Sequence, residues 1–275
     1  MENSGLLFGV SVLGGFIGAM SGMGGGVVLI PALTFLGLPI KQAIAISLVS
    51  VIATSSGSAS AYVRDGITNL KVGMFLEMFT IVGGVIGALL AVRLQSRWLF
   101  VLFGVVLLAT WGVLFRQRRD IWKPAGPPDR FSRWLELEGS YFDQASRETV
   151  DYQATRAGWG GLCMVGAGIL SGMLGIGAGA LKVLIHDVVM RMPPKVSTTT
   201  SNLIIGVTAL SGVSVYLGEG LIDTRLAAPV IIGIMAGAFL GTRVLVRLHN
   251  RQVRAFFLVV LAALGLEMIA RGIRG

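Results

Sequence analysis

Two Gly-rich motifs are the places in this sequence best suited to bind a ligand. They occupy residues 21–26 and 171–179, and each interrupts an apolar stretch. A helix that starts after such a break presents unpaired N–H groups and a partial positive charge, which attract anions. Glycine also lets a backbone approach a ligand closely, although the same glycines would permit tight helix crossings. We predict that an anion binds the backbone of Gly24, Gly25, Gly26, Gly177 and Gly179.

Lys182 follows the second motif within the apolar run 180–185. An ionisable residue inside a membrane segment indicates a functional site by default, because burying a charge there is expensive. The ammonium could pair with an oxygen of the bound anion. The alternatives are that Lys182 extends to the membrane surface or pairs with Asp187.

Small polar residues in two further stretches could line the same site. Ser47 opens the hydroxyl-rich stretch 47–60, and Ser201 and Asn202 close the stretch 197–202. Hydroxyl and amide groups donate hydrogen bonds to anion oxygens. The same groups could instead join membrane helices to one another, and the sequence favours neither interpretation.

Two titratable residues, His186 and Glu77, could carry a proton that is coupled to transport. His186 lies one turn after Lys182, and the charge of histidine changes near neutral pH. Glu77 lies one to two turns into an apolar segment. We favour an interfacial position for both, His186 beside Asp187 and Glu77 near Lys71, with proton coupling as the alternative.

The composition is that of a protein that crosses a membrane several times. Of the 275 residues, 54% are hydrophobic and 13% are charged, whereas ordinary domains have about 25% charged residues. The net charge of +9 does not indicate a nucleic-acid partner, because the basic residues separate apolar runs and form no stripe. The lipid bilayer is the expected partner, and we expect a multi-pass protein of the inner membrane.

Catalytic and metal-binding patterns are absent from the sequence. One cysteine and two histidines predict neither a disulfide nor a metal site. The nucleotide-binding loop, zinc-protease and catalytic-triad signatures do not occur. We therefore expect no enzyme activity and no cofactor.

Ten apolar segments divide equally between the two halves of the chain. A full crossing needs about 20 residues, so segments 27–37 and 178–190 are long enough for half a crossing only. We predict an all-α polytopic membrane protein with about eight to ten transmembrane segments, in which Gly-rich breaks interrupt helices or form re-entrant elements. The segments are 5–20, 27–37, 43–63, 72–94, 98–115, 157–173, 178–190, 196–217, 226–246 and 252–270.

The halves repeat each other at an offset of 154 residues. We predict two homologous repeats, 1–115 and 157–275, joined by a charged cytoplasmic loop, 116–156. If each half crosses an odd number of times, 16 Lys and Arg lie inside and six outside, which favours inverted repeats. The matching pairs include Ser47 and Ser201, Thr54 and Thr208, Tyr62 and Tyr216, Gly83 and Gly237, and Gly87 and Gly241.

Two local patterns concern the scaffold. Glycines four residues apart, at Gly83 and Gly87 and again at Gly233, Gly237 and Gly241, predict close helix packing. Residues 131–137 of the charged loop could form a short amphipathic piece at the membrane surface. We favour an ordinary linker there.

The sequence resembles the TauE/SafE family of sulfite and organosulfonate exporter-like permeases. The resemblance covers nearly the whole chain except 116–156, and it implies a secondary transporter that exports a small sulfur-containing anion, such as sulfite, sulfoacetate or a related organosulfonate, across the bacterial inner membrane. An integral-membrane enzyme or an assembly partner without transport activity is the alternative. Proton coupling and a homo-oligomer stay open. The matching motifs are 21–26 with Pro31, 39–47, 177–183, 199–202, and the turns 64–66 and 218–220.

Overall fold

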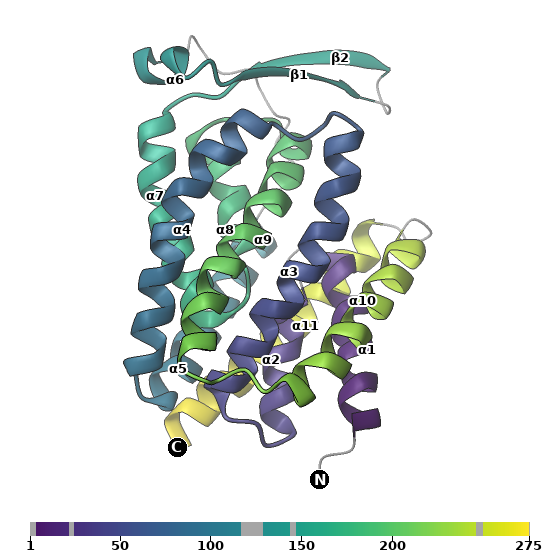
Figure 1. The fold of residues 1–275 in the computed structure, drawn as a ribbon. Coiled ribbons are helices and arrows are strands. Elements are labelled where there is room, and N and C mark those ends of the chain that lie inside the picture. Colours follow the sequence, from purple (N-terminus) through teal and green to yellow (C-terminus); the bar gives the residue numbers. More distant parts are fainter. Residues whose placement is uncertain (1–3, 22–24, 117–128, 144–146, 246–249, 275) are drawn as a thin grey trace.

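The computed structural model describes residues 4–21, 25–116, 129–143, 147–245 and 250–274. Residues 22–24 fall outside this range, so the predicted site residue Gly24 lies outside the described residues. The described residues form a bundle of helices with a two-stranded sheet across one end (Figure 1).

Ten helical segments build the bundle, five in each half of the described chain. In the first half they are α1 (Ser4–Ser21), α2 (Gly26–Phe35), α3 (Ile40–Arg64), α4 (Leu70–Arg93) and α5 (Ser96–Arg116). In the second half they are α7 (Ala157–Leu174), α8 (Gly179–Leu184) with the π-helical turn η1 (Ile185–Val189), α9 (Pro194–Gly218), α10 (Thr224–Leu245) and α11 (Asn250–Arg274).

Most of these helices are apolar enough for a membrane. Within the described residues, α3, α4, α5, α7 and α9 contain stretches long and apolar enough to cross a bilayer, and α1, α2 and α10 contain shorter apolar stretches. Their outer faces expose large apolar side chains, among them Met74, Met78 and Val82 on α4. The chain is therefore a polytopic membrane protein.

The most extensive packing joins helices of different halves. Helix α1 packs against α10, α4 against α7, α5 against α11 and α3 against α9. The bounds of α9, Pro194 and Gly218, lie 154 residues after the bounds of α3, Ile40 and Arg64. Equivalent helices of the two halves thus meet at α3 and α9.

Each Gly-rich break lies at the tip of a helical hairpin. The first hairpin is α1 with α2, and the second is α7 with α8 and η1. At the end of the bundle that holds both chain termini, Arg271 donates a hydrogen bond of 3.1 Å to the Thr34 carbonyl near the end of α2. At the sheet end, the Thr155 amide donates to the Met190 carbonyl at 3.0 Å and so joins the start of α7 to the end of η1. The two hairpins therefore enter the bundle from opposite ends.

Glycines let these helices approach closely. A Cβ atom added at Gly83 of α4 would overlap with the Val165 carbonyl oxygen of α7, and one added at Gly237 of α10 would overlap with the Val12 carbonyl oxygen of α1. Small residues at membrane helix interfaces allow such backbone contact. These glycines belong to the scaffold.

The charged segment is folded and adds two strands to a mostly helical chain, so the all-α prediction holds for the bundle but not for this segment. It contains α6 (Arg130–Trp134) and an antiparallel pair, β1 (Glu138–Asp143) with β2 (Glu148–Gln153). Asp129 caps α6 by accepting a hydrogen bond from the Ser132 amide. Tyr141 and Tyr152 point to the buried face of the sheet, and Asn69 of the α3–α4 turn donates to the Tyr152 hydroxyl at 3.0 Å. In Figure 1 this unit lies across the ends of α4, α7 and α9.

Candidate functional site

The backbone of the second break cannot continue a helix. Gly175, Gly177 and Ala178 have φ angles of +66°, +69° and +48°, in the left-handed region that ends helices. Glycine adopts this region freely, whereas alanine does so at a cost of about 1–2 kcal/mol. The left-handed run ends α7 and starts α8 at Gly179.

The two breaks touch inside the bundle. A Cβ atom added at Gly26 would lie 2.5 Å from the Gly175 carbonyl oxygen and 2.6 Å from the Ser47 hydroxyl. A Cβ atom added at Gly177 would lie 2.8 Å from Ile205. Gly25, Gly26, Gly177 and Gly179 are all buried. The structure thus brings the predicted Gly26 against the second break, whereas the predicted Gly177 packs against Ile205 of α9.

Two of the predicted hydroxyls bind carbonyl groups of the second break. Ser47 donates to the Gly175 carbonyl at 2.8 Å, and Ser201 donates to the Gly179 carbonyl at 3.3 Å. Ser55 donates to the backbone carbonyl of Asn202. Broken helices leave carbonyl groups without helical partners, and neighbouring serines can satisfy them. In this structure Ser47 and Ser201 hold the break in place.

Lys182 is fully buried and its ammonium contacts a neutral hydroxyl. The side chain is 0% exposed, and Nζ donates a 2.8 Å hydrogen bond to Thr208 Oγ1 on α9. Thr208 in turn donates to the Ile204 carbonyl at 2.7 Å. No described carboxylate forms a salt bridge with Lys182. Lys182 therefore neither extends to the surface nor pairs with Asp187 here.

His186 is also fully buried, where η1 packs against the start of α9. Its Nδ1 lies 3.2 Å from the Ser197 carbonyl oxygen. Because that oxygen can only accept, Nδ1 carries a hydrogen and donates it. Its Nε2 is buried and has no hydrogen-bond partner among the described residues. His186 and Asp187 lie in the π-helical turn η1, and such turns are frequent at functional sites.

Glu77 is half-buried on α4 and does not form an ion pair with Lys71 in the described contacts. Lys71 instead pairs with Glu136 of the charged segment at 3.0 Å. One Glu77 oxygen, Oε1, is buried without a hydrogen-bond partner in the described part of the chain. The charges of Glu77 and Lys182 attract each other. Glu77, Lys182 and His186 thus form one electrostatic group between α4, α8 and α9.

Three polar residues of this region were not among the individual residues predicted for the site. They are Thr208, which binds Lys182, Ser197, which binds His186, and Ser171, whose buried hydroxyl has no partner among the described residues. Thr208 was visible only as the repeat partner of Thr54. Its contact with Lys182 depends on how α8 lies against α9, which sequence spacing does not give.

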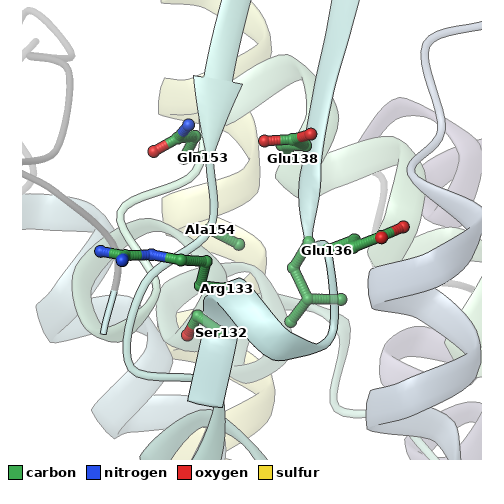
Figure 2. Close-up of a pocket in the computed structure, with 7 residues that line it drawn as sticks. Ser132, Arg133, Glu136, Glu138, Gln153 and Ala154 are labelled. Carbon is green, nitrogen blue, oxygen red and sulfur yellow. The ribbon is translucent and has the colours of Figure 1, made fainter. Parts of the chain in front are cut away.

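The described cavities differ in size and chemistry. One of about 20 Å³ lies beside the second break, next to Ile176 and Gly179, and one water needs about 10–15 Å³ by this measure. A larger one, of about 380 Å³, lies between α6 and the adjoining ends of β1 and β2, and Arg133, Glu136 and Glu138 are among the residues that line it (Figure 2). The space beside the break fits a water, so the site is closed around its own side chains.

Comparison with known proteins gives a consistent set of matches. The sequence profile of the family described as "Sulfite exporter TauE/SafE" matches residues 7–268. The chain is 25% identical to "Probable membrane transporter protein YunE" of Bacillus subtilis (strain 168), covering 96% of each chain. It is 28% identical to "Probable membrane transporter protein YdhB" of the same organism, over 86% of this chain and 87% of the other. A third relative, "Probable membrane transporter protein MJ0441" of Methanocaldococcus jannaschii, is 24% identical over 96% and 94%. No solved structure matches the chain.

Proposed function

We propose that this chain, which belongs to the sulfite exporter TauE/SafE family, exports a small sulfur-containing anion across the bacterial inner membrane. Sulfite, sulfoacetate and related organosulfonates are the candidate substrates. The family consists of membrane transporters and not enzymes. The substrate and the direction of transport are the parts that the proposal adds.

The observation that carries the proposal is the buried ammonium of Lys182. A buried charge needs a partner of opposite sign, because its desolvation is expensive. The described contact of Lys182 Nζ is the neutral Thr208 hydroxyl, and an ammonium has three donors. Two donors are therefore available to the oxygens of an anion. A ligand there would lie near the backbone of Gly25, Gly26, Gly177 and Gly179, with Gly24 next to them in sequence.

The proposed transport cycle uses two inverted repeats, 1–115 and 157–275. The helical hairpins that open to opposite ends, and the pairing of α3 with α9, support this arrangement. Inverted repeats that rock against each other can expose a central site to either side. We assign the folded charged segment to the cytoplasm, and the excess of basic residues at that end of the bundle supports this assignment.

The site would couple the binding of the anion to protonation of Glu77 or His186. Both have a buried polar atom without a hydrogen-bond partner in the described residues. Such atoms can gain or lose a proton when the local charge changes. The anion and the coupling proton are thus assigned to one group of side chains.

The test is the thermal stability of the purified protein in detergent with sulfite, sulfoacetate, taurine, thiosulfate, sulfate or acetate, at matched pH and ionic strength. A ligand at 100 times its Kd stabilises a single-site protein by about 2.7 kcal/mol. We expect this gain for at least one sulfur anion, and we expect Lys182→Met to abolish it. Lys41→Met is the matched control, because Lys41 binds the Val92 carbonyl at the far end of the bundle. No gain with any sulfur anion, or a gain that survives Lys182→Met, would refute the proposal.

A further inference from the structure

We propose that Glu77 is the internal counter-anion of Lys182, that the transported anion displaces it, and that Glu77 takes up one proton each time an anion binds. This inference rests on the proposed function, since it describes what happens at the same site when the anion arrives. It assigns the coupling ion, a proton, and its ratio to the anion.

The register of α4 against α9 directs Glu77 toward Lys182. A Cβ atom added at Gly73 would lie 3.6 Å from Thr200 of α9, and one added at Gly84 would lie 3.3 Å from Thr208. Positions 73, 77 and 84 share one face of a helix, because residues four and eleven apart recur on the same side. Glu77 therefore faces α9 between the levels of Thr200 and Thr208.

Lys182 contacts the same stretch of α9. Its Nζ donates a hydrogen bond to Thr208 Oγ1. Thr208 is the last residue of the α9 stretch, Thr200 to Thr208, that Glu77 faces. The two charged groups attract each other but form no salt bridge among the described contacts. The buried Oε1 of Glu77 has no hydrogen-bond partner among the described residues, and Lys182 has two donors beyond the one that binds Thr208.

Few other described titratable groups face this pair. Asp187 is the other nearby carboxylate, but it follows Lys182 by five residues and lies beside Ser197, away from the face that carries Lys182. His186 lies one turn closer to the sheet end than Lys182 and binds Ser197. The titratable residues on the packed helices are Cys163 on α7, Lys195 and Tyr216 near the ends of α9, Lys41, Tyr62 and Arg64 near the ends of α3, and Lys71 and Arg93 at the ends of α4.

The balance of charges at the site fixes the ratio at one proton for each anion. With Glu77 ionised, its charge cancels that of Lys182. A singly charged anion on Lys182 would leave a net negative charge in a medium of low dielectric constant, which is unfavourable. Protonation of Glu77 removes that charge. One proton therefore enters and leaves with each anion, and transport of a singly charged anion is electroneutral.

The first experiment tests the counter-anion without any ligand. Unfolding temperatures are measured for the full-length protein, Lys182→Met, Glu77→Gln and the double variant. We expect the double variant to unfold at a higher temperature than Lys182→Met, because removal of Lys182 alone leaves Glu77 unbalanced. If the change in unfolding temperature of the double variant equals the sum of the changes of the two single variants, Glu77 is not the counter-anion of Lys182. Glu267→Gln, a carboxylate paired with Arg271 on α11, is the matched control and should combine additively with Lys182→Met.

The second experiment measures binding against pH. Sulfoacetate is the first probe, because the sulfonate group that would bind Lys182 keeps one negative charge between pH 6 and 8.5. If sulfoacetate does not stabilise the protein, another of the six anions whose charge is constant in this range replaces it. We expect the apparent Kd of the wild-type protein to rise toward tenfold per pH unit at the alkaline end, where Glu77 must first bind a proton. Glu77→Gln should remove this slope, while Glu77→Asp and Asp187→Asn should keep it.

The outcomes separate the two claims. Binding by the wild-type protein with the same slope in Glu77→Gln overturns the inference and leaves the proposed function standing. Binding that fails for all six anions in the wild-type protein overturns the proposed function and the inference together. If Glu77→Gln does not fold, Glu77→Met replaces it: loss of the slope supports the inference, and a retained slope overturns it.

Discussion

Substitution of Gly26 by alanine tests the contact between the two Gly-rich breaks. The new Cβ atom would lie 2.5 Å from the Gly175 carbonyl oxygen, 2.6 Å from the Ser47 hydroxyl and 3.2 Å from the Cα atom of Ile176. Two of these atoms are backbone of a buried segment and cannot rotate away. Forcing one extra carbon into a well-packed site costs about 1–3 kcal/mol.

The same substitution disturbs a hydrogen bond. Ser47 would have to turn away from Gly175, and an unsatisfied buried carbonyl costs about 1–3 kcal/mol. Because the two effects share the same atoms, they overlap, and we expect a total loss of about 2–4 kcal/mol in the free energy of unfolding. Transport should fall further than stability, since the site lies beside this contact.

The assay is reversible unfolding in detergent with Gly57→Ala as the control. Gly57 lies on α3 with no atom within 4 Å of an added Cβ, so alanine there should be neutral or stabilising by up to about 1 kcal/mol through its helix propensity. Equal stabilities for Gly26→Ala and Gly57→Ala would show that the breaks do not touch as described, and the site built on them would fail.

The remaining predictions concern the charged segment. Burial raises the pKa of Asp129, but hydrogen bonds from Ser132 and from the Arg156 amide outweigh it, so the pKa is lowered from its ordinary value of 3.8. The stability that these hydrogen bonds give is therefore present above pH 3.8 and is lost as the pH falls through the lowered pKa. Measured as protection of residues 129–143 from hydrogen exchange, this acid-dependent loss should disappear in Asp129→Asn. The same loss in the variant would contradict the prediction. Tyr152→Phe removes the acceptor of Asn69 and should destabilise the sheet by about 1 kcal/mol, visible as faster proteolysis between β1 and β2; unchanged cleavage would argue against the contact.

The helices could be predicted from the sequence because apolar length and breaks determine them. The expected segments 27–37 and 178–190 became α2 and α8 with η1, since glycine-rich backbone cannot extend either helix at its start. The β-hairpin was missed for a physical reason. Its alternation is carried by few apolar residues, Tyr141, Val150 and Tyr152, among many charged ones, and its buried face exists only because α4 and α7 end beneath it.

The site could be predicted in its components but not in its contacts. Lys182 stands out as a charge in an apolar run, and Ser47 and Ser201 stand out as hydroxyls at matching positions. Which group each one binds depends on the packing of helices from different halves, which periodicity does not encode. For the same reason the burial of His186 beside Ser197 could not be predicted from the sequence.

The pairing of α1 with α10, α4 with α7 and α5 with α11 has a consequence for synthesis of the chain. Each of these helices of the first half is made long before its partner. The interacting surfaces of α1, including Val12, stay in lipid until α10 has entered the membrane. The first half is thus an unfinished assembly, comparable to one subunit of an interlocked dimer. Coexpressed halves, separated within 117–128, should reassemble through these same surfaces, whereas either half alone should be degraded.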